Sequence, residues 1–186
     1  MLMHRTMKGY FRSRFSFFFV ATAGLLFAML AVPASAHALS LAVCTGSHAA
    51  TWSPGVTYAT EGHTVTTDSQ WTCVQLAAPV LTSASSHEQF TAQFSCGSLL
   101  TPAPATWTIK WADNVTSTFS FTSTVNAVDG NLVITALGNI TNGRYAGKPA
   151  NATFTLLNLG STLNSQCSSS TGVTSASGLS TLIISL

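Results

Sequence analysis

Charged residues are scarce in this chain, where Asp, Glu, Lys and Arg make up 6% of the 186 residues. Four of the seven cations, Arg5, Lys8, Arg12 and Arg14, precede residue 15, whereas all five acidic residues lie beyond residue 60. Beyond residue 36, three cations therefore stand against five acids, which leaves a net charge of −2 with histidine neutral. Nucleic-acid binding normally needs several clustered cations. The sequence thus predicts no nucleic-acid partner.

Strong helix formers and familiar catalytic or metal-binding motifs are also missing. Lys, Glu, Arg and Gln, which favour surface helices, are few, and no stretch shows a hydrophobic period of 3.6 residues. The cysteine spacing matches no zinc motif. No G-x-S-x-G nucleophile elbow occurs. We therefore predict an all-β protein that is not an enzyme and has no catalytic residues.

What is present begins with an apparent export signal. Cations precede an apolar run over residues 15–32, and Ala34-Ser35-Ala36 provides the small residues that a signal peptidase requires. We expect cleavage after Ala36, or after Ala38 in an overlapping frame. The prediction is a signal peptide over residues 1–36 and one secreted domain over residues 37–186, with no stable membrane span after cleavage.

The remainder of the chain consists of short alternating segments separated by turn residues. A period of two is typical of β-strands with one buried face. It predicts that Trp71, Trp107 and Trp111 point into the core. Pro54-Gly55, Asp129-Gly130 and Asn142-Gly143 are predicted turns. Eight or nine short strands with regular turns predict a single antiparallel β-sandwich of Ig-like or jelly-roll type, stabilised by disulfides.

Four cysteines, Cys44, Cys73, Cys96 and Cys167, lie beyond the signal segment. An even number of cysteines in a secreted chain predicts two disulfides. Because Cys73 and Cys96 each end an alternating strand on its apolar face, we favour the pairs Cys73–Cys96 and Cys44–Cys167. The alternative, Cys44–Cys73 with Cys96–Cys167, is nearly as compatible with the sequence.

Four segments carry a resemblance that covers essentially the whole chain beyond the signal segment. They are CTGSHAATWSPGVT (44–57), WTIKWADNVTSTFSF (107–121), GNITNGRYAG (138–147) and CSSSTGVTSASGLSTLII (167–184). In this order they resemble a family of small secreted actinobacterial proteins of unknown function. The resemblance implies an extracellular location, a β-sandwich fold and disulfides, but no catalytic residues. This chain departs from the family in having Trp52 where members often have Tyr, and Arg144-Tyr145 in the Gly-rich segment.

Aromatic side chains are the main candidates for binding. Trp52 and Tyr145 lie in predicted turns, so we expect them to be exposed. Aromatic faces on a β-sandwich can stack against sugar rings. The sequence therefore predicts a non-enzymatic extracellular binding or surface protein, with a carbohydrate or a cell-envelope component as its candidate ligand.

A copper site is the alternative. Cleavage after Ala36 would leave His37 as the N-terminal residue, with a free amine beside its imidazole. A second imidazole, from His48, His63 or His87, would complete three nitrogen ligands, and Cu(II) favours nitrogen ligands in tetragonal geometry. The alternative function is thus a small copper protein or enzyme with a histidine brace. Cleavage in the overlapping frame would remove His37. No other cofactor is predicted.

Overall fold

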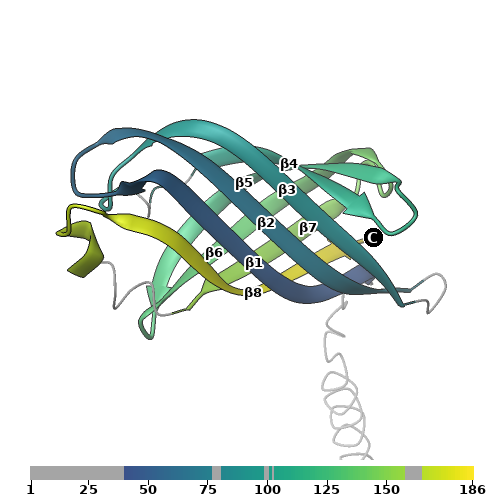
Figure 1. The fold of residues 1–186 in the computed structure, drawn as a ribbon. Helices are drawn as coiled ribbons and strands as arrows, with labels where there is room; N and C mark the ends of the chain where they lie inside the picture. The colour runs from purple at the N-terminus through teal and green to yellow at the C-terminus, as the bar shows by residue number, and fades with distance from the viewer. Residues whose placement is uncertain (1–39, 77–80, 99–100, 102, 158–164) are drawn as a thin grey trace, which may run out of the picture. The chain divides into compact units, whose positions relative to one another are not determined.

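The computed structural model describes residues 40–76, 81–98, 101, 103–157 and 165–186 (Figure 1). The predicted signal peptide and His37 lie outside the described residues. The chain forms a closed barrel in which each strand pairs with the next and the last pairs with the first. Among the described residues, no helix is long and apolar enough to cross a lipid bilayer. The strands are β1 (Ser40–Val56), β2 (Glu61–Gln75), β3 (Leu81–Phe94), β4 (Ala103–Trp111), β5 (Thr116–Val128), β6 (Asn131–Gly143), β7 (Pro149–Leu156) and β8 (Val173–Ser185).

The closure of the sheet shows that the predicted β-sandwich is wrong. β1 and β8 lie side by side (Figure 1) and pair in antiparallel register from Ser40↔Ser185 to Val56↔Val173. The prediction of one buried face is confirmed for β2, in which every second residue from His63 to Cys73 is buried. Alternation identifies the buried face of each strand but says nothing about whether the first and last strands pair. Both a sandwich and a barrel satisfy the same pattern.

Two predicted turns had opposite outcomes. Asp129-Gly130 connects β5 to β6, and its φ angles of 49° and 76° suit a two-residue hairpin turn with both central residues left-handed. Pro54-Gly55, in contrast, lies inside β1, so this predicted turn is wrong. The β1–β8 register shifts between Thr51 and Val56. Proline is tolerated there because it has no N–H to donate where the ladder is interrupted.

The disulfides correct the favoured cysteine pairing. The structure contains Cys44–Cys73 and Cys96–Cys167, so the predicted pairs Cys73–Cys96 and Cys44–Cys167 are wrong and the alternative holds. Cys44 lies directly opposite Cys73 on β1 and β2. An antiparallel hairpin places the end of β2 against the start of β3, so Cys73 faces Thr82 while Cys96 lies beyond the far end of β3.

Large side chains fill one half of the barrel, which we call the filled half. Its cluster is built around Trp71, Trp111 and Phe119, each no more than 4% exposed. Each buried indole N–H donates to a serine: Trp71 Nε1 to Ser180 Oγ over 2.7 Å, and Trp111 Nε1 to Ser117 Oγ over 2.8 Å. Buried indole N–H groups usually find such a partner. Serine is therefore part of this core as well as of the surface.

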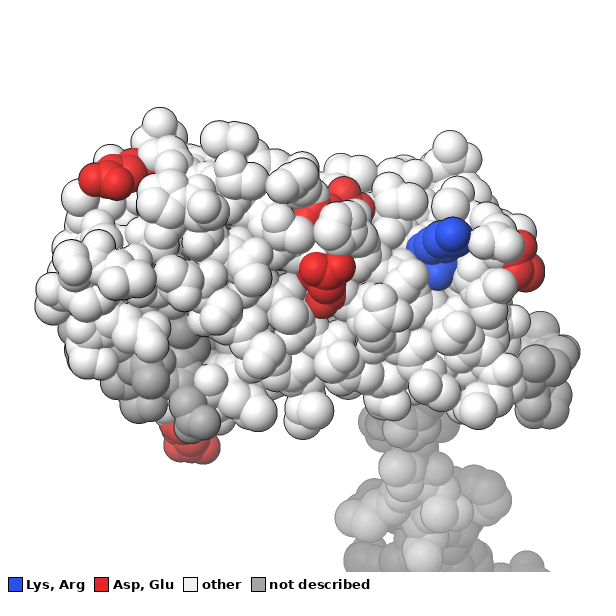
Figure 2. Space-filling model, in the orientation of Figure 1, with Lys and Arg blue, Asp and Glu red and all other residues white. Residues whose placement is uncertain are grey.

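The outer surface carries few charges. On the face that Figure 2 shows, the charged side chains are separated from one another by uncharged ones. Two ion pairs join described residues, His87 with Asp68 and Arg144 with Asp113. The guanidinium of Arg144 also lies 5.3 Å from the ring centroid of Trp111. The absence of a nucleic-acid partner stays a prediction.

Candidate functional site

A cavity of about 410 Å³ lies in the other half of the barrel interior, which we call the hollow half. Its walls are mainly aromatic and aliphatic, with Trp52, Trp107, Phe121 and Phe154 supplying the large ring faces. Ligand cavities typically measure about 300–1,000 Å³. An eight-stranded barrel is just wide enough to be filled by its own side chains or to hold one small ligand. In this barrel, side chains fill one half of the interior, and the other half has space for a small ligand.

Small side chains create the cavity. Five small inward side chains line the space: Ala50 on β1, Thr67 on β2, Ala92 on β3, Ala105 on β4 and Ser123 on β5. The filled half also has small inward residues, such as Ala42 and Ala84, but the indoles of Trp71 and Trp111 and the ring of Phe119 occupy its interior. Small side chains on five neighbouring strands therefore leave room between the aromatic walls of the cavity.

His48 on β1 is a polar group held firmly in the cavity wall. Its Nδ1 lies 2.8 Å from Ser69 Oγ, and its ring contacts Trp107 and Phe154 with centroid distances of 5.7 and 4.4 Å. Burial lowers the pKa of His48 to about 4, against a smaller raising effect of Asp68. The imidazole is therefore neutral at pH 7. Its Nε2 has no hydrogen-bond partner among the described residues.

β3 and β4 separate beside the cavity. They pair only at Ala84↔Trp111 and Ser85↔Lys110, although both strands continue. We call the stretch formed by residues 86–94 and 103–109 the seam. Within it, the Thr108 N–H donates to Glu88 Oε1 over 2.5 Å, so a side chain bridges strands that no longer share a ladder.

The seam is the mouth of the cavity. Of the lining residues, Phe90, Thr101, Ala103 and Pro104 are exposed, and all four lie on the seam or in the connection from β3 to β4. Phe90 is 42% exposed, which is high for a phenylalanine that also faces an apolar cavity. The lining residues on the opposite wall, such as Phe154 and Leu156, are buried.

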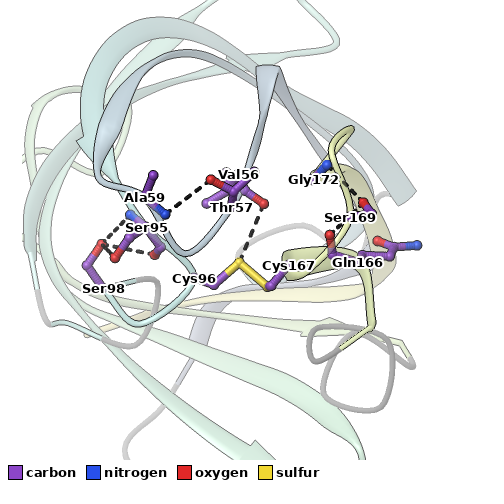
Figure 3. The surroundings of a disulfide bond; sticks show 10 residues. All are labelled: Val56, Thr57, Ala59, Ser95, Cys96, Ser98, Gln166, Cys167, Ser169 and Gly172. Carbon is purple, nitrogen blue, oxygen red and sulfur yellow. Dashed lines mark hydrogen bonds between the residues drawn. A yellow bond between two sulfur atoms is a disulfide. The ribbon is translucent and has the colours of Figure 1, made fainter.

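The Cys96–Cys167 disulfide lies at the end of the hollow half. Figure 3 shows it linking the segment after β3 to the short helical turn at 165–167 that precedes β8. It packs with the fully buried Val56 and Val173. Cys96 Sγ lies 3.4 Å from the Val56 carbonyl oxygen, a contact without a shared proton because the sulfur is oxidised. The Cys96 N–H instead donates to the Thr57 carbonyl over 2.8 Å.

The structure does not bring the two predicted aromatic binding residues together. Trp52 is only 8% exposed and lines the cavity, so the expectation that it lies on the surface is wrong. Tyr145 follows β6 toward the filled half, where it is half-buried and packs edge-on against Trp111 at 5.5 Å. The two residues lie toward opposite ends of the barrel, and neither belongs to an exposed aromatic face.

The candidate copper ligands are also dispersed. His48 and His63 point into the barrel, whereas His87 lies outside it and contacts Asp68 at 2.6 Å. His63 Nδ1 contacts the Pro54 carbonyl oxygen at 2.7 Å, and its Nε2 is buried without a partner. Within the described ranges, no three His, Cys, Asp or Glu residues are arranged to hold a metal ion. The remaining brace ligand, His37, lies outside those ranges.

Comparison with protein-family models, curated proteins and solved structures gave no match. The resemblance to secreted actinobacterial proteins therefore stays a prediction. The candidate site rests on the geometry of this chain alone, which is an apolar cavity inside an antiparallel barrel, with a neutral imidazole in its wall and a lateral mouth.

Proposed function

We propose that this protein is a non-enzymatic extracellular binding protein that holds one small apolar molecule inside its barrel. The cavity of about 410 Å³ carries this proposal. Two disulfides are compatible with an oxidising, extracellular environment. The predicted export signal supports the same location.

The size and chemistry of the cavity favour an apolar ligand over a carbohydrate. An apolar cavity of about 150 Å³ is known to bind benzene, so this one offers roughly 2.7 times that space, enough for two or three fused rings. A sugar carries hydroxyl groups around its whole ring. Most of them would lose their hydrogen bonds to water against Trp107, Phe121 and Phe154, and each unpaired group would cost free energy.

Titration with 1-aminoanthracene, a fluorescent three-ring probe, tests this function. We expect its emission to rise on binding and the tryptophan emission to fall by energy transfer, because Trp52 and Trp107 line the cavity. Ala50→Phe should weaken binding at least tenfold by filling the space. The matched control Thr51→Phe, whose side chain is on the exposed face of β1, should leave it unchanged.

Two results would contradict the proposal. One is the absence of any fluorescence response in the wild-type protein up to the solubility limit of the probe. The other is equal binding by the wild type and a folded Ala50→Phe variant, which would place the probe outside the barrel.

A further inference from the structure

We propose that the cavity selects a neutral ring compound bearing one hydroxyl or carbonyl group, which hydrogen-bonds to Nε2 of His48. This inference rests on the proposed function, because it names the class of molecule that the cavity accepts. It is carried by the position of one imidazole within an otherwise largely apolar wall.

The His48 ring is fixed before any ligand arrives. Ser69, itself 1% exposed, occupies Nδ1, while Trp107 lies nearly parallel to the imidazole at an interplanar angle of 18°. Phe154 contacts the ring from a tilted orientation. These contacts leave Nε2 as the nitrogen available to a ligand. Since the ring loses little further freedom on binding, a hydrogen bond at Nε2 costs little conformational entropy.

The hydrogen bond at Nε2 can run in either direction. The Ser69 hydroxyl can donate to Nδ1 or accept from it, so the imidazole can place its single proton on either nitrogen. Nε2 therefore accepts from a ligand hydroxyl in one tautomer and donates to a ligand carbonyl in the other. Both groups suit the same position in the wall.

The wall favours an uncharged ligand. Among the described residues that line the cavity, none carries a carboxylate, ammonium or guanidinium group. The nearby Glu88 carboxylate accepts the Thr108 N–H at the seam, and Asp68 lies on the outer face beside His87. A ligand carboxylate inside the barrel would have no cationic partner, and an unpaired buried charge is strongly unfavourable.

Flat rings match the aromatic surfaces that surround His48. Trp107 contacts Phe154 at 5.1 Å and stands perpendicular to Phe121, with their ring centroids 5.3 Å apart. Such walls present both ring faces and ring edges. A ligand ring can therefore pack in an offset-stacked or an edge-to-face arrangement, the two that aromatic pairs prefer. A fused-ring ligand can therefore pack against them while its single polar group reaches His48.

Three matched probes test the inference on the protein at pH 7.5: 2-naphthol, naphthalene and 2-naphthoate. We expect 2-naphthol to bind about tenfold more tightly than naphthalene, the effect of one hydrogen bond in a dry site. We expect 2-naphthoate to bind more weakly than both. His48→Phe should abolish the preference for 2-naphthol while changing naphthalene affinity less than threefold. The control Thr67→Val, which removes the hydroxyl of another lining residue, should keep the preference.

The outcomes separate this inference from the proposed function. If none of the probes binds, the proposed function fails. If naphthalene and 2-naphthol bind the wild type equally, the cavity binds ligands but the role of His48 is wrong. A preference that survives in a folded His48→Phe variant also overturns the inference, and its loss in Thr67→Val would assign the hydrogen bond to Thr67 instead. If His48→Phe does not fold, equal binding of naphthalene and 2-naphthol by the wild type still overturns the inference.

Discussion

Acidification from pH 7.5 to pH 4 should destabilise the barrel through His48 by about 3 kcal/mol. The pKa of this imidazole is about 4 in the folded protein because burial disfavours its charged form, against an ordinary value of 6.5. Between these two values the unfolded chain binds a proton that the folded chain excludes. Stability is therefore complete above pH 6.5 and is lost as the pH falls toward 4. One pKa unit corresponds to about 1.36 kcal/mol, which gives a loss of roughly 1.4 kcal/mol at pH 5.5 and about 3 kcal/mol at pH 4.

Urea unfolding at pH 7.5, 5.5 and 4 measures this loss as the difference between the wild type and His48→Phe. The subtraction cancels carboxylates that titrate in both proteins. The pKa of His87 is raised by its hydrogen bond with Asp68, so His87 acts in the opposite direction and stabilises the fold at low pH. The control His87→Gln should therefore steepen the loss rather than remove it. If wild type and His48→Phe lose stability in parallel, His48 is not buried and neutral, and the reasoning fails.

Two further predictions concern the mouth and the closure of the barrel. If the β3–β4 register continued through the seam, Gln89 would oppose Thr106, both on the outer face. The oxidised Gln89→Cys/Thr106→Cys variant should therefore slow 1-aminoanthracene association and dissociation in stopped flow by about equal factors. The Gln89→Ser/Thr106→Ser control should match the wild type, and unchanged rates in the clamped protein would place the mouth elsewhere. Gly46→Ala should destabilise the protein by more than about 3 kcal/mol in urea, because its Cβ would lie 1.8 Å from the Gln70 carbonyl oxygen. Gly62→Ala, where the nearest atom would be 3.8 Å away, should cost about 1 kcal/mol or less, and similar losses in both variants would refute this explanation.

The sequence predicted the inward faces of the strands because that information is local. Trp107 was expected to point inward, and it lines the cavity. Trp71 and Trp111 were expected in the core, and both are buried there. A period of two assigns these side chains to one face of their strand, and this assignment does not depend on which strands lie beside it. Fold class, in contrast, depends on the pairing of β1 with β8, which joins opposite ends of the described chain.

The cavity could not be predicted because its cause is spread over separate strands. Ala50, Ala105 and Ser123 are unremarkable in their own segments, since small residues occur in many strands. They leave a void only because the closed barrel brings them around one interior space. The disulfides were ambiguous for a similar reason. The prediction that Cys73 points inward was correct. Its disulfide partner, however, depended on which residue of the neighbouring strand lies opposite Cys73, and that residue is Cys44 on β1.

The pairing of buried polar groups argues that the cavity is a binding site rather than a packing defect. In the filled half, Ser180 and Ser117 each accept a buried indole N–H, so serine completes that core. In the hollow half, Ser69 plays the same part for His48, but an imidazole has two nitrogens and Ser69 engages only one. Among the described residues, Nε2 of His63 is fully buried without a partner, whereas Nε2 of His48 is not fully buried, since His48 lines the open space of the cavity. A fixed imidazole that keeps one nitrogen for a ligand hydroxyl or carbonyl group is an arrangement that suits a binding site.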